Sequence, residues 1–119
     1  MKLTSKTIAS LKDKLDENER IGFITLNGRI LEVVETLNIS PQPNDNFMFN
    51  PDDLQTYVFS GEHKTKATWH THPTDNANLS ANDYVGFLNY PELKHIIVAK
   101  DEIRIYEVKD GAIFQTTQN

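Results

Sequence analysis

The chain of 119 residues contains no cysteine. This absence excludes disulfides, thiolate zinc sites, cysteine nucleophiles and iron–sulfur clusters, so any bound metal must be held by histidine and carboxylate side chains. The sequence also lacks the run of about 18 apolar residues that a membrane-spanning helix needs. Its first twenty residues carry too many charges for a secretory signal. We therefore expect a cytoplasmic protein without a membrane partner.

Positive charge is scarce as well, because 12 Lys and Arg residues face 17 Asp and Glu residues, for a net charge of -5. A protein that binds nucleic acid by neutralising phosphates usually carries an excess of basic residues, so we expect no nucleic-acid partner. Apolar residues make up 38% of the chain. Even with glycine added, this is slightly below the roughly 45–50% of globular domains, which predicts a core with long polar loops.

Hydrophobic periodicity and turn residues predict a single domain over residues 1–119. The predicted helices cover residues 3–17, 51–61 and 80–90, and the predicted strands cover residues 20–26, 29–36, 66–71, 95–99, 103–108 and 112–116. Asn27-Gly28 favours a type I′ hairpin turn, and Asn50 before Pro51 is typical of a helix start. Residues 38–50 and 73–79 are expected as loops. This order indicates an α/β fold with a mixed, mostly antiparallel sheet flanked by helices.

A His-x-His pair gives the first indication of chemistry. Because side chains two apart on a strand point to the same side, His70 and His72 present two imidazoles on one face, with Trp69 in the core and Thr71 turned away. Asp83 follows eleven residues later, in the first turn of a predicted helix. Two histidines and one carboxylate leave one coordination position open for water, which is the arrangement of catalytic zinc.

Each part of this pattern also has an ordinary structural explanation. Two strand histidines are more often surface or hydrogen-bonded residues than ligands. Ser80 and Asp83 have the spacing of a capping box, and these capping roles are compatible with a metal site. His63 is expected to be a solvated loop residue and His95 a strand-edge residue. The acidic residues between 45 and 53 are expected to form a solvated surface and a helix N-terminus.

The combined spacing is more specific than its parts. His-x-His, seven residues, Ser, two residues and Asp resembles the metal motif of the JAMM (MPN+, Mov34/JAB) metallopeptidases, with the Ser at Ser80. The segment from Glu19 to Gly22 is similar to the one that carries the family's upstream glutamate, with Ile21 where a cysteine is common. Glu32 and Glu35 are alternative positions for that glutamate.

A second resemblance covers residues 38–53. Asn38, Phe47 and Pro51-Asp52-Asp53 are similar to a stretch of JAB domains in the tail-assembly proteins of long-tailed phages. The whole resemblance extends from about residue 15 to residue 108 and therefore implies a single JAB/MPN-type domain, cytidine-deaminase-like in fold. It further implies a bacterium or a phage-infected host cell as the setting, or association with the virion.

The resemblance also implies an activity, the zinc-dependent hydrolysis of peptide or isopeptide bonds. His70, His72 and Asp83 would hold one Zn²⁺ per chain, Glu19 would be the general base, and Ser80 would donate a hydrogen bond to the oxyanion. The substrate would be a ubiquitin-like protein, a tail protein or a peptidoglycan peptide.

The alternative is a non-catalytic MPN-type scaffold or tail-assembly interaction protein. Degenerate members of the family usually lack a ligand or the glutamate, whereas this chain has all five positions. A zinc deaminase, whose fold is related, needs a Cys-x-x-Cys pair or an equivalent, and the absence of cysteine argues strongly against it.

Overall fold

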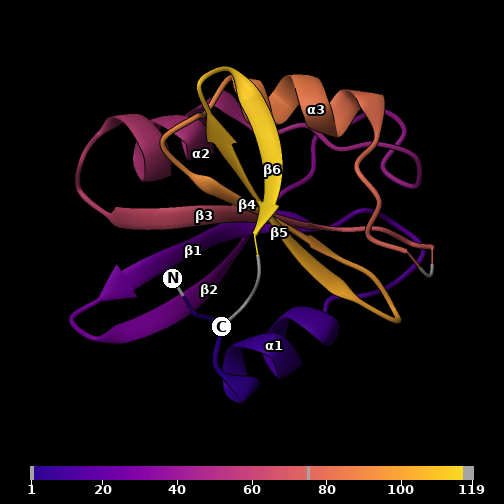
Figure 1. Cartoon of the computed structure of the whole chain (residues 1–119), viewed down its shortest axis with the longest axis horizontal. Coiled ribbons are helices and arrows are strands. Elements are labelled where there is room, and N and C mark those ends of the chain that lie inside the picture. The colour runs from indigo at the N-terminus through magenta and orange to yellow at the C-terminus, as the bar shows by residue number, and fades with distance from the viewer. Residues whose placement is uncertain (1, 75, 117–119) are drawn as a thin grey trace.

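The computed structural model describes residues 2–74 and 76–116, and six strands in this part form one sheet (Figure 1). The strands are β1 (Ile21–Asn27), β2 (Ile30–Thr36), β3 (Lys64–Thr71), β4 (Lys94–Val98), β5 (Ile103–Lys109) and β6 (Ala112–Thr116). Their order across the sheet is β2-β1-β3-β4-β5-β6. Every neighbouring pair is antiparallel except β3 and β4, which are parallel. The expected mixed, mostly antiparallel sheet is therefore confirmed.

Helices cover both faces of this sheet. They are α1 (Ser5–Lys12), α2 (Pro51–Leu54), which continues as the π-helical turn η1 (Gln55–Phe59), and α3 (Ala81–Leu88). Figure 1 shows α1 on one side of the sheet and α2 and α3 on the other. Among the described residues, no helix has the length and apolar character required to cross a membrane.

The first helix is shorter than the predicted span of residues 3–17. Thr4 caps its start by accepting a hydrogen bond from the backbone N–H of Thr7. After Lys12 the chain turns more tightly, and the Asp16 carboxylate accepts a hydrogen bond from the N–H of Asn18. Such side-chain bonds offer the backbone an alternative to the helical pattern, which is why the helix ends early.

The β1–β2 hairpin is present, but its turn differs from the expected type I′. Asn27 pairs with Ile30 as the last residue of the strand, so Gly28 and Arg29 form the loop. Of these two, only Gly28 has a positive φ, 62°. Type I′ requires positive φ at both central residues, and a glycine alone at the first position is the type II′ pattern.

The hairpin between β5 and β6 does meet the type I′ requirement. Lys109 pairs with Ala112, and both residues between them, Asp110 and Gly111, have positive φ, 53° and 76°. The turn expected around Lys109-Asp110-Gly111 is therefore confirmed.

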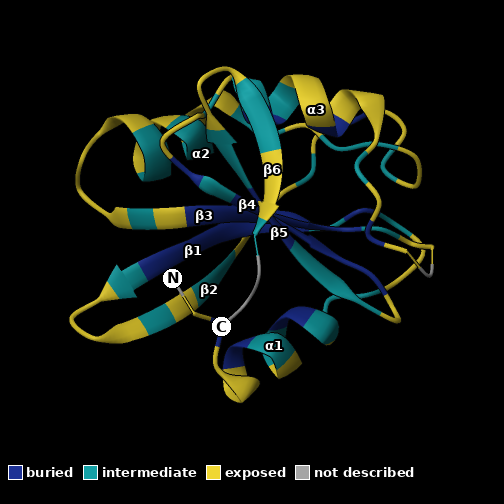
Figure 2. Cartoon of the chain, in the orientation of Figure 1, coloured by how far each residue is buried: buried dark blue, intermediate teal, exposed yellow. Residues whose placement is uncertain are grey.

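The alternation of side chains along the central strands divides the core between the two faces. On the α1 face, Trp69 packs with Leu11, Ile96 and other buried residues, as expected for that tryptophan. On the α3 face, Phe87 packs with Ile97 and their neighbours. Figure 2 shows the buried positions concentrated along the middle strands. His70 faces α3 because it follows Trp69 by one residue.

The expectation for His95 is wrong. It lies on β4, an interior strand between β3 and β5, and only 1% of it is exposed. Its Nδ1 lies 2.7 Å from Thr68 Oγ1, and its Nε2 lies 3.0 Å from the backbone oxygen of Tyr90. Its ring stacks on Phe87 at 4.3 Å. A histidine with both nitrogens satisfied is compatible with the core, which periodicity alone does not reveal.

Candidate metal centre

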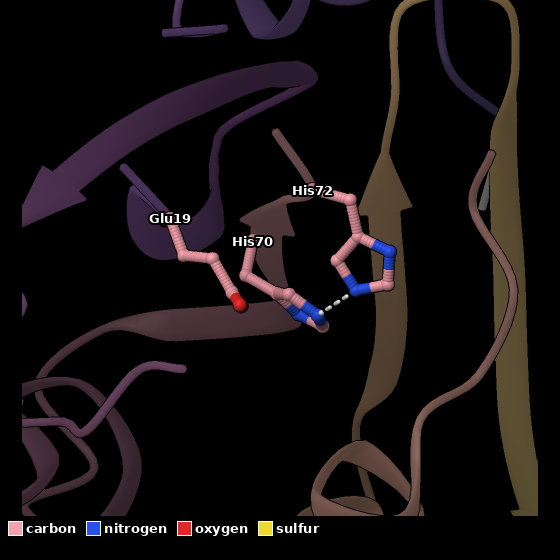
Figure 3. A group of neighbouring side chains, drawn as sticks. All are labelled: Glu19, His70 and His72. Carbon is pink, nitrogen blue, oxygen red and sulfur yellow. Dashed lines mark hydrogen bonds between the residues drawn. The ribbon is translucent and has the colours of Figure 1, made fainter. Parts of the chain in front are cut away.

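Two neighbouring strands bring Glu19 and the histidine pair together. Glu19 lies two residues before the start of β1, His70 is the penultimate residue of β3, and Ile21 pairs with His70 across the two strands. One ligand atom from each of Glu19, His70 and His72 lies within 4.8 Å of the others (Figure 3). Glu19 and His70 are buried and His72 is half-buried. This group can hold a metal ion.

Asp83 comes from the first turn of α3 and contacts both imidazoles. Its Oδ1 lies 3.0 Å from His70 Nε2, and its Oδ2 lies 3.1 Å from His72 Nε2. The two Nε2 atoms are 3.1 Å apart. Asp83 is 2% exposed, so its carboxylate contacts the two histidines instead of solvent. The expected convergence of a helical carboxylate with the strand histidines is thus present in the structure.

The hydrogen bond on the far side of His72 determines which of its nitrogens carries a proton. Its Nδ1 lies 3.3 Å from the backbone oxygen of Asn76, and because a carbonyl only accepts, Nδ1 carries the hydrogen. A neutral His72 therefore directs the lone pair of Nε2 toward His70 and the Asp83 carboxylate. Such a meeting of electron-rich atoms is repulsive unless a proton or a cation lies among them.

The same donor atoms fit a small divalent cation. Nitrogen and oxygen ligands at about 2.0–2.1 Å from a tetrahedral zinc lie about 3.3 Å from one another. The observed separations of 3.0 and 3.1 Å are only slightly shorter. Two imidazoles and a carboxylate are also a usual donor set for zinc, whereas magnesium and calcium prefer oxygen ligands alone.

Ser80 holds Asp83 in place through a reciprocal capping box. The Ser80 Oγ accepts a hydrogen bond from the backbone N–H of Asp83, and the Ser80 backbone N–H donates to Asp83 Oδ2, both at 3.1 Å. The capping explanation of this pair is therefore confirmed. It is compatible with a metal site because Oδ2 still faces His72 and the hydroxyl hydrogen of Ser80 is not used by the cap.

The two carboxylates of the centre have opposite pKa shifts. Burial raises the pKa of Glu19 to about 7. The charge of His72 acts to lower this pKa, and the charge of Asp83 adds a smaller increase. Burial would also raise the pKa of Asp83, but hydrogen bonds from His70 and His72 hold it well below its usual range. Asp83 therefore stays an anion while Glu19 exchanges a proton near neutrality. Two carboxylates with such divergent pKa values can take different chemical roles.

The histidines respond to the same surroundings in opposite directions. Burial lowers the pKa of His70, although Asp83 opposes this effect. Burial also acts to lower the pKa of His72, but the hydrogen bond and charge of Asp83, together with the charge of Glu19, raise it above its ordinary value. We attribute the difference to exposure, since His70 is fully buried and His72 is not. Positive charge is thus favoured at the outer histidine.

The loop of residues 38–50 fixes the position of Glu19. The Asn38 side-chain amide donates to the backbone oxygen of Glu19 at 2.8 Å and to that of Asn46 at 3.2 Å. Its oxygen accepts from the backbone N–H groups of Ser40 and Met48, both at 3.0 Å. Asn38 therefore ties both ends of the loop to the segment that carries Glu19. The sequence contained a signal for this role, an asparagine just after a strand and before a proline-rich loop.

The alternative glutamates lie outside the centre. Glu35 forms a two-point ion pair with Arg20, with both nitrogen–oxygen distances at 2.7 Å, and Glu32 accepts from Asn27 at 3.0 Å. Both lie on β2 and are exposed. Among the candidates from the sequence, Glu19 is therefore the one beside the histidine pair. His63 is exposed, as expected, and its ring packs on Tyr57 at 4.8 Å.

A cleft of about 280 Å³ opens beside these residues. Glu19, Ser80 and Asp83 line it. Residues of α3 and of the end of the 38–50 loop also line it, and in that loop Phe47 packs on His70 with 4.4 Å between ring centroids. Asp45 also lines the cleft, so the acidic residues of this region are not only a solvated surface and a helix start. The cleft therefore adjoins Glu19 and Asp83 of the centre.

Comparison with known proteins establishes the fold of the chain but no family. No protein-family model matches the sequence, and no curated protein matches it. A protein of Desulfitobacterium hafniense has a similar solution structure, with a TM-score of 0.66 and 21% identity over 93% of this chain and 83% of that one. A protein of Salinibacter ruber is similar with a TM-score of 0.64 and 14% identity, over 98% and 89% of the two chains. At these identities the similarity concerns the fold alone.

Proposed function

We propose that this chain is a zinc-dependent hydrolase of peptide or isopeptide bonds, built on a JAB/MPN-type domain of the cytidine-deaminase-like class. One observation carries the proposal. Five residues that fit the metallopeptidase spacing, spread over more than half the chain, meet around one point of the fold: Glu19, His70, His72, Ser80 and Asp83. Hydrogen-bonded strand histidines and a Ser80–Asp83 capping box would not by themselves require Glu19 to lie beside the histidine pair.

In this proposal His70, His72 and Asp83 hold the metal. When bound, Zn²⁺ polarises a carbonyl and lowers the pKa of a coordinated water to about 7. The buried Asp83 supplies the negative charge, and the Asn76 carbonyl keeps the Nε2 of His72 free for the metal. These contacts orient the ligands before the metal arrives.

Glu19 and Ser80 serve the reaction itself. A Glu19 carboxylate oxygen accepts a proton from the attacking water and delivers it to the leaving nitrogen, which general acid–base groups do at a gain of about 10²–10⁴ in rate. Its position supports this role, because it lies within 4.8 Å of the two histidines without a hydrogen bond to either. The Ser80 hydroxyl, whose oxygen accepts the N–H of Asp83, donates to the developing oxyanion.

The proposed substrates are a ubiquitin-like protein, a phage tail protein or a peptidoglycan peptide. The proposed setting is the cytoplasm of a bacterium or of a phage-infected cell, or the virion.

The second candidate is a non-catalytic scaffold or tail-assembly interaction module. It is favoured by large apolar side chains that remain exposed, among them Val85 on α3 at 63% and Phe114 on β6 at 51%. In a scaffold, a partner protein would cover such side chains. The hydrolase proposal is preferred because a scaffold does not need a carboxylate beside a histidine pair.

Zinc content gives the first test. Elemental analysis after zinc supplementation and dialysis should find one ion per wild-type chain. His72→Ala should lose it, and the matched change at an exposed histidine outside the centre, His63→Ala, should retain it. A wild-type chain without zinc, or equal zinc in both variants, would contradict the metal site.

Hydrolysis gives the second test. The zinc-loaded chain is incubated with peptides from a digested proteome and with isopeptide-linked ubiquitin-like proteins, and mass spectrometry detects new termini. Glu19→Gln should keep zinc and lose activity by at least about 10². Activity retained in that variant contradicts the assignment of the base, and zinc binding without cleavage of any substrate favours the scaffold.

A further inference from the structure

Helix α3 presents a regular stripe of three residues to the cleft. Asn82, Gly86 and Asn89 all line it, at positions i, i+4 and i+7. With 3.6 residues per turn, these positions fall within about 60° of one another around the helix axis. Asn89 follows the last helical residue but keeps helical dihedrals, φ -75° and ψ -18°, so the stripe extends to it. Two side-chain amides therefore face the cleft with a glycine between them.

Both amides are available to a ligand. Asn82 and Asn89 are exposed, and within residues 2–74 and 76–116 their hydrogen bonds use backbone atoms, not their side-chain amides. A primary amide offers a donor and an acceptor side by side, which matches the C=O and N–H of a peptide main chain. A charged or purely apolar ligand would leave one of these groups without a partner.

The spacing of the two amides matches an extended peptide. Seven residues of α-helix span about 10.5 Å. In a polyproline-II segment, main-chain groups three residues apart point to the same side and repeat every 9.3 Å or so. An asparagine side chain covers the difference of about 1 Å by rotation about its two bonds. One peptide running along α3 can therefore meet both amides at once.

Gly86 and the charges of the cleft fit the same occupant. A Cβ built at Gly86 has no atom within 4 Å, so this position is an open gap where a main chain can approach the helix closely. The lining includes Asp45 in addition to Glu19 and Asp83, and no Lys or Arg is among the described residues that line it. This charge disfavours an acidic peptide and favours a neutral or basic one.

We propose that α3 binds an extended, non-acidic peptide segment of the substrate through Asn82 and Asn89, which hydrogen-bond main-chain groups three residues apart. The inference rests on the proposed function in taking a polypeptide as the substrate. It adds a binding mode that recognises the main chain of the substrate and therefore tolerates many different substrate side chains. Ser80 and Asp83 at the start of the helix line the same cleft, so a peptide bound along the stripe adjoins the metal centre.

The test measures the affinity of defined peptide pools for the zinc-supplemented chain by fluorescence anisotropy, with Glu19→Gln as the background to prevent cleavage. The first pool contains labelled, acetylated octapeptides of randomised Ala and Lys. The second replaces Lys by Glu, and the third is the first with every amide N-methylated, which removes the main-chain donors. The first pool should bind, the second more weakly, and the third not at all.

Variants then locate the contact. Asn82→Ala and Asn89→Ala should each weaken binding of the first pool about 3- to 10-fold, the usual effect of one hydrogen bond. Gly86→Leu should abolish it by filling the gap. The matched control, Asn27→Ala, removes an exposed amide at the β1–β2 hairpin and should leave the Kd unchanged.

The inference is overturned if the N-methylated pool binds like its parent, if neither asparagine variant differs from Asn27→Ala, or if no pool binds. Its failure is separable from that of the hydrolase. Zinc uptake and cleavage with unchanged affinity in both asparagine variants would refute only the binding mode. Affinity that depends on both asparagines in a chain that takes up no zinc would support the binding mode and refute the hydrolase.

Discussion

Gly22 lies where the structure leaves no room for a side chain. It is on β1, three residues after Glu19, and pairs with Trp69 on β3. A Cβ built there would lie 1.9 Å from the backbone oxygen of Val34 and 2.8 Å from two atoms of the Trp69 ring. The indole N–H of Trp69 donates to that same oxygen at 3.2 Å. Gly22→Ala must therefore displace the ring or the carbonyl, and either movement breaks this bond.

The cost can be assembled from these contacts. Overpacking by one methyl group typically costs about 1–3 kcal/mol, and the broken hydrogen bond adds about 1 kcal/mol. Alanine also restricts the unfolded chain more than glycine does, and this effect stabilises the folded protein by about 0.4–1 kcal/mol. Because the added Cβ would lie 1.9 Å from a backbone oxygen, we take the upper end of the overpacking range and expect a net loss of about 3 kcal/mol. For 119 residues, an unfolding entropy of about 2.1 cal/mol/K per residue converts this loss to a fall in Tm of about 12 °C.

The same substitution at Gly86 is the matched control. That position is inside α3, and its added Cβ meets nothing within 4 Å. Because alanine favours a helix over glycine by about 1 kcal/mol, Gly86→Ala should raise Tm by about 4 °C. The two variants thus make one chemical change with opposite expected signs.

Thermal unfolding is followed by circular dichroism in the presence of a chelator, so that zinc binding does not contribute. Emission from the single tryptophan reports on the ring beside Gly22. A Gly22→Ala protein within about 2 °C of wild type with unchanged emission, or a Gly86→Ala protein that falls as far as Gly22→Ala, would refute the packing argument.

Three further predictions concern residues around the centre. Ser80→Ala should lower the free energy of unfolding in urea by about 1 kcal/mol, because the N-cap is lost. It should also lower the hydrolysis rate about 10²-fold with zinc retained. Ser80→Thr should restore both the stability and the rate. Asn38→Ala should leave zinc content unchanged but lower kcat by releasing Glu19. Asn38→Asp keeps the two acceptor bonds but turns an oxygen toward the carbonyls of Glu19 and Asn46, so it should not restore kcat. Burial lowers the pKa of His95 from 6.5 to about 4, so the unfolded chain binds the extra proton between these values. Stability should therefore fall as pH drops from 6.5 toward 4, by up to about 3 kcal/mol, and urea unfolding of His95→Gln should lack this component.

Interactions between neighbouring residues allowed several elements to be predicted from the sequence. Ser80 and Asp83 form the capping box that their spacing predicts, and Asn50 caps α2 ahead of Pro51. These features depend on a few neighbouring residues, so the sequence contains nearly all the information. The same is not true of the β1–β2 turn, where pairing of Asn27 with Ile30 moved the loop by one residue. Strand register depends on both partners and on the core behind them.

The sequence by itself determined the possible chemistry. Without cysteine, a metal site had to use histidine and carboxylate, and the alternation of a strand placed His70 and His72 on one face. It left three glutamates open as the base. Tertiary structure placed Glu19, and neither Glu32 nor Glu35, beside the histidine pair, because the antiparallel pairing of β1 with β3 sets it near His70 while Glu35 is held by Arg20 at the sheet edge. That choice is long-range, since it depends on which strands become neighbours, and periodicity along one segment does not contain that information.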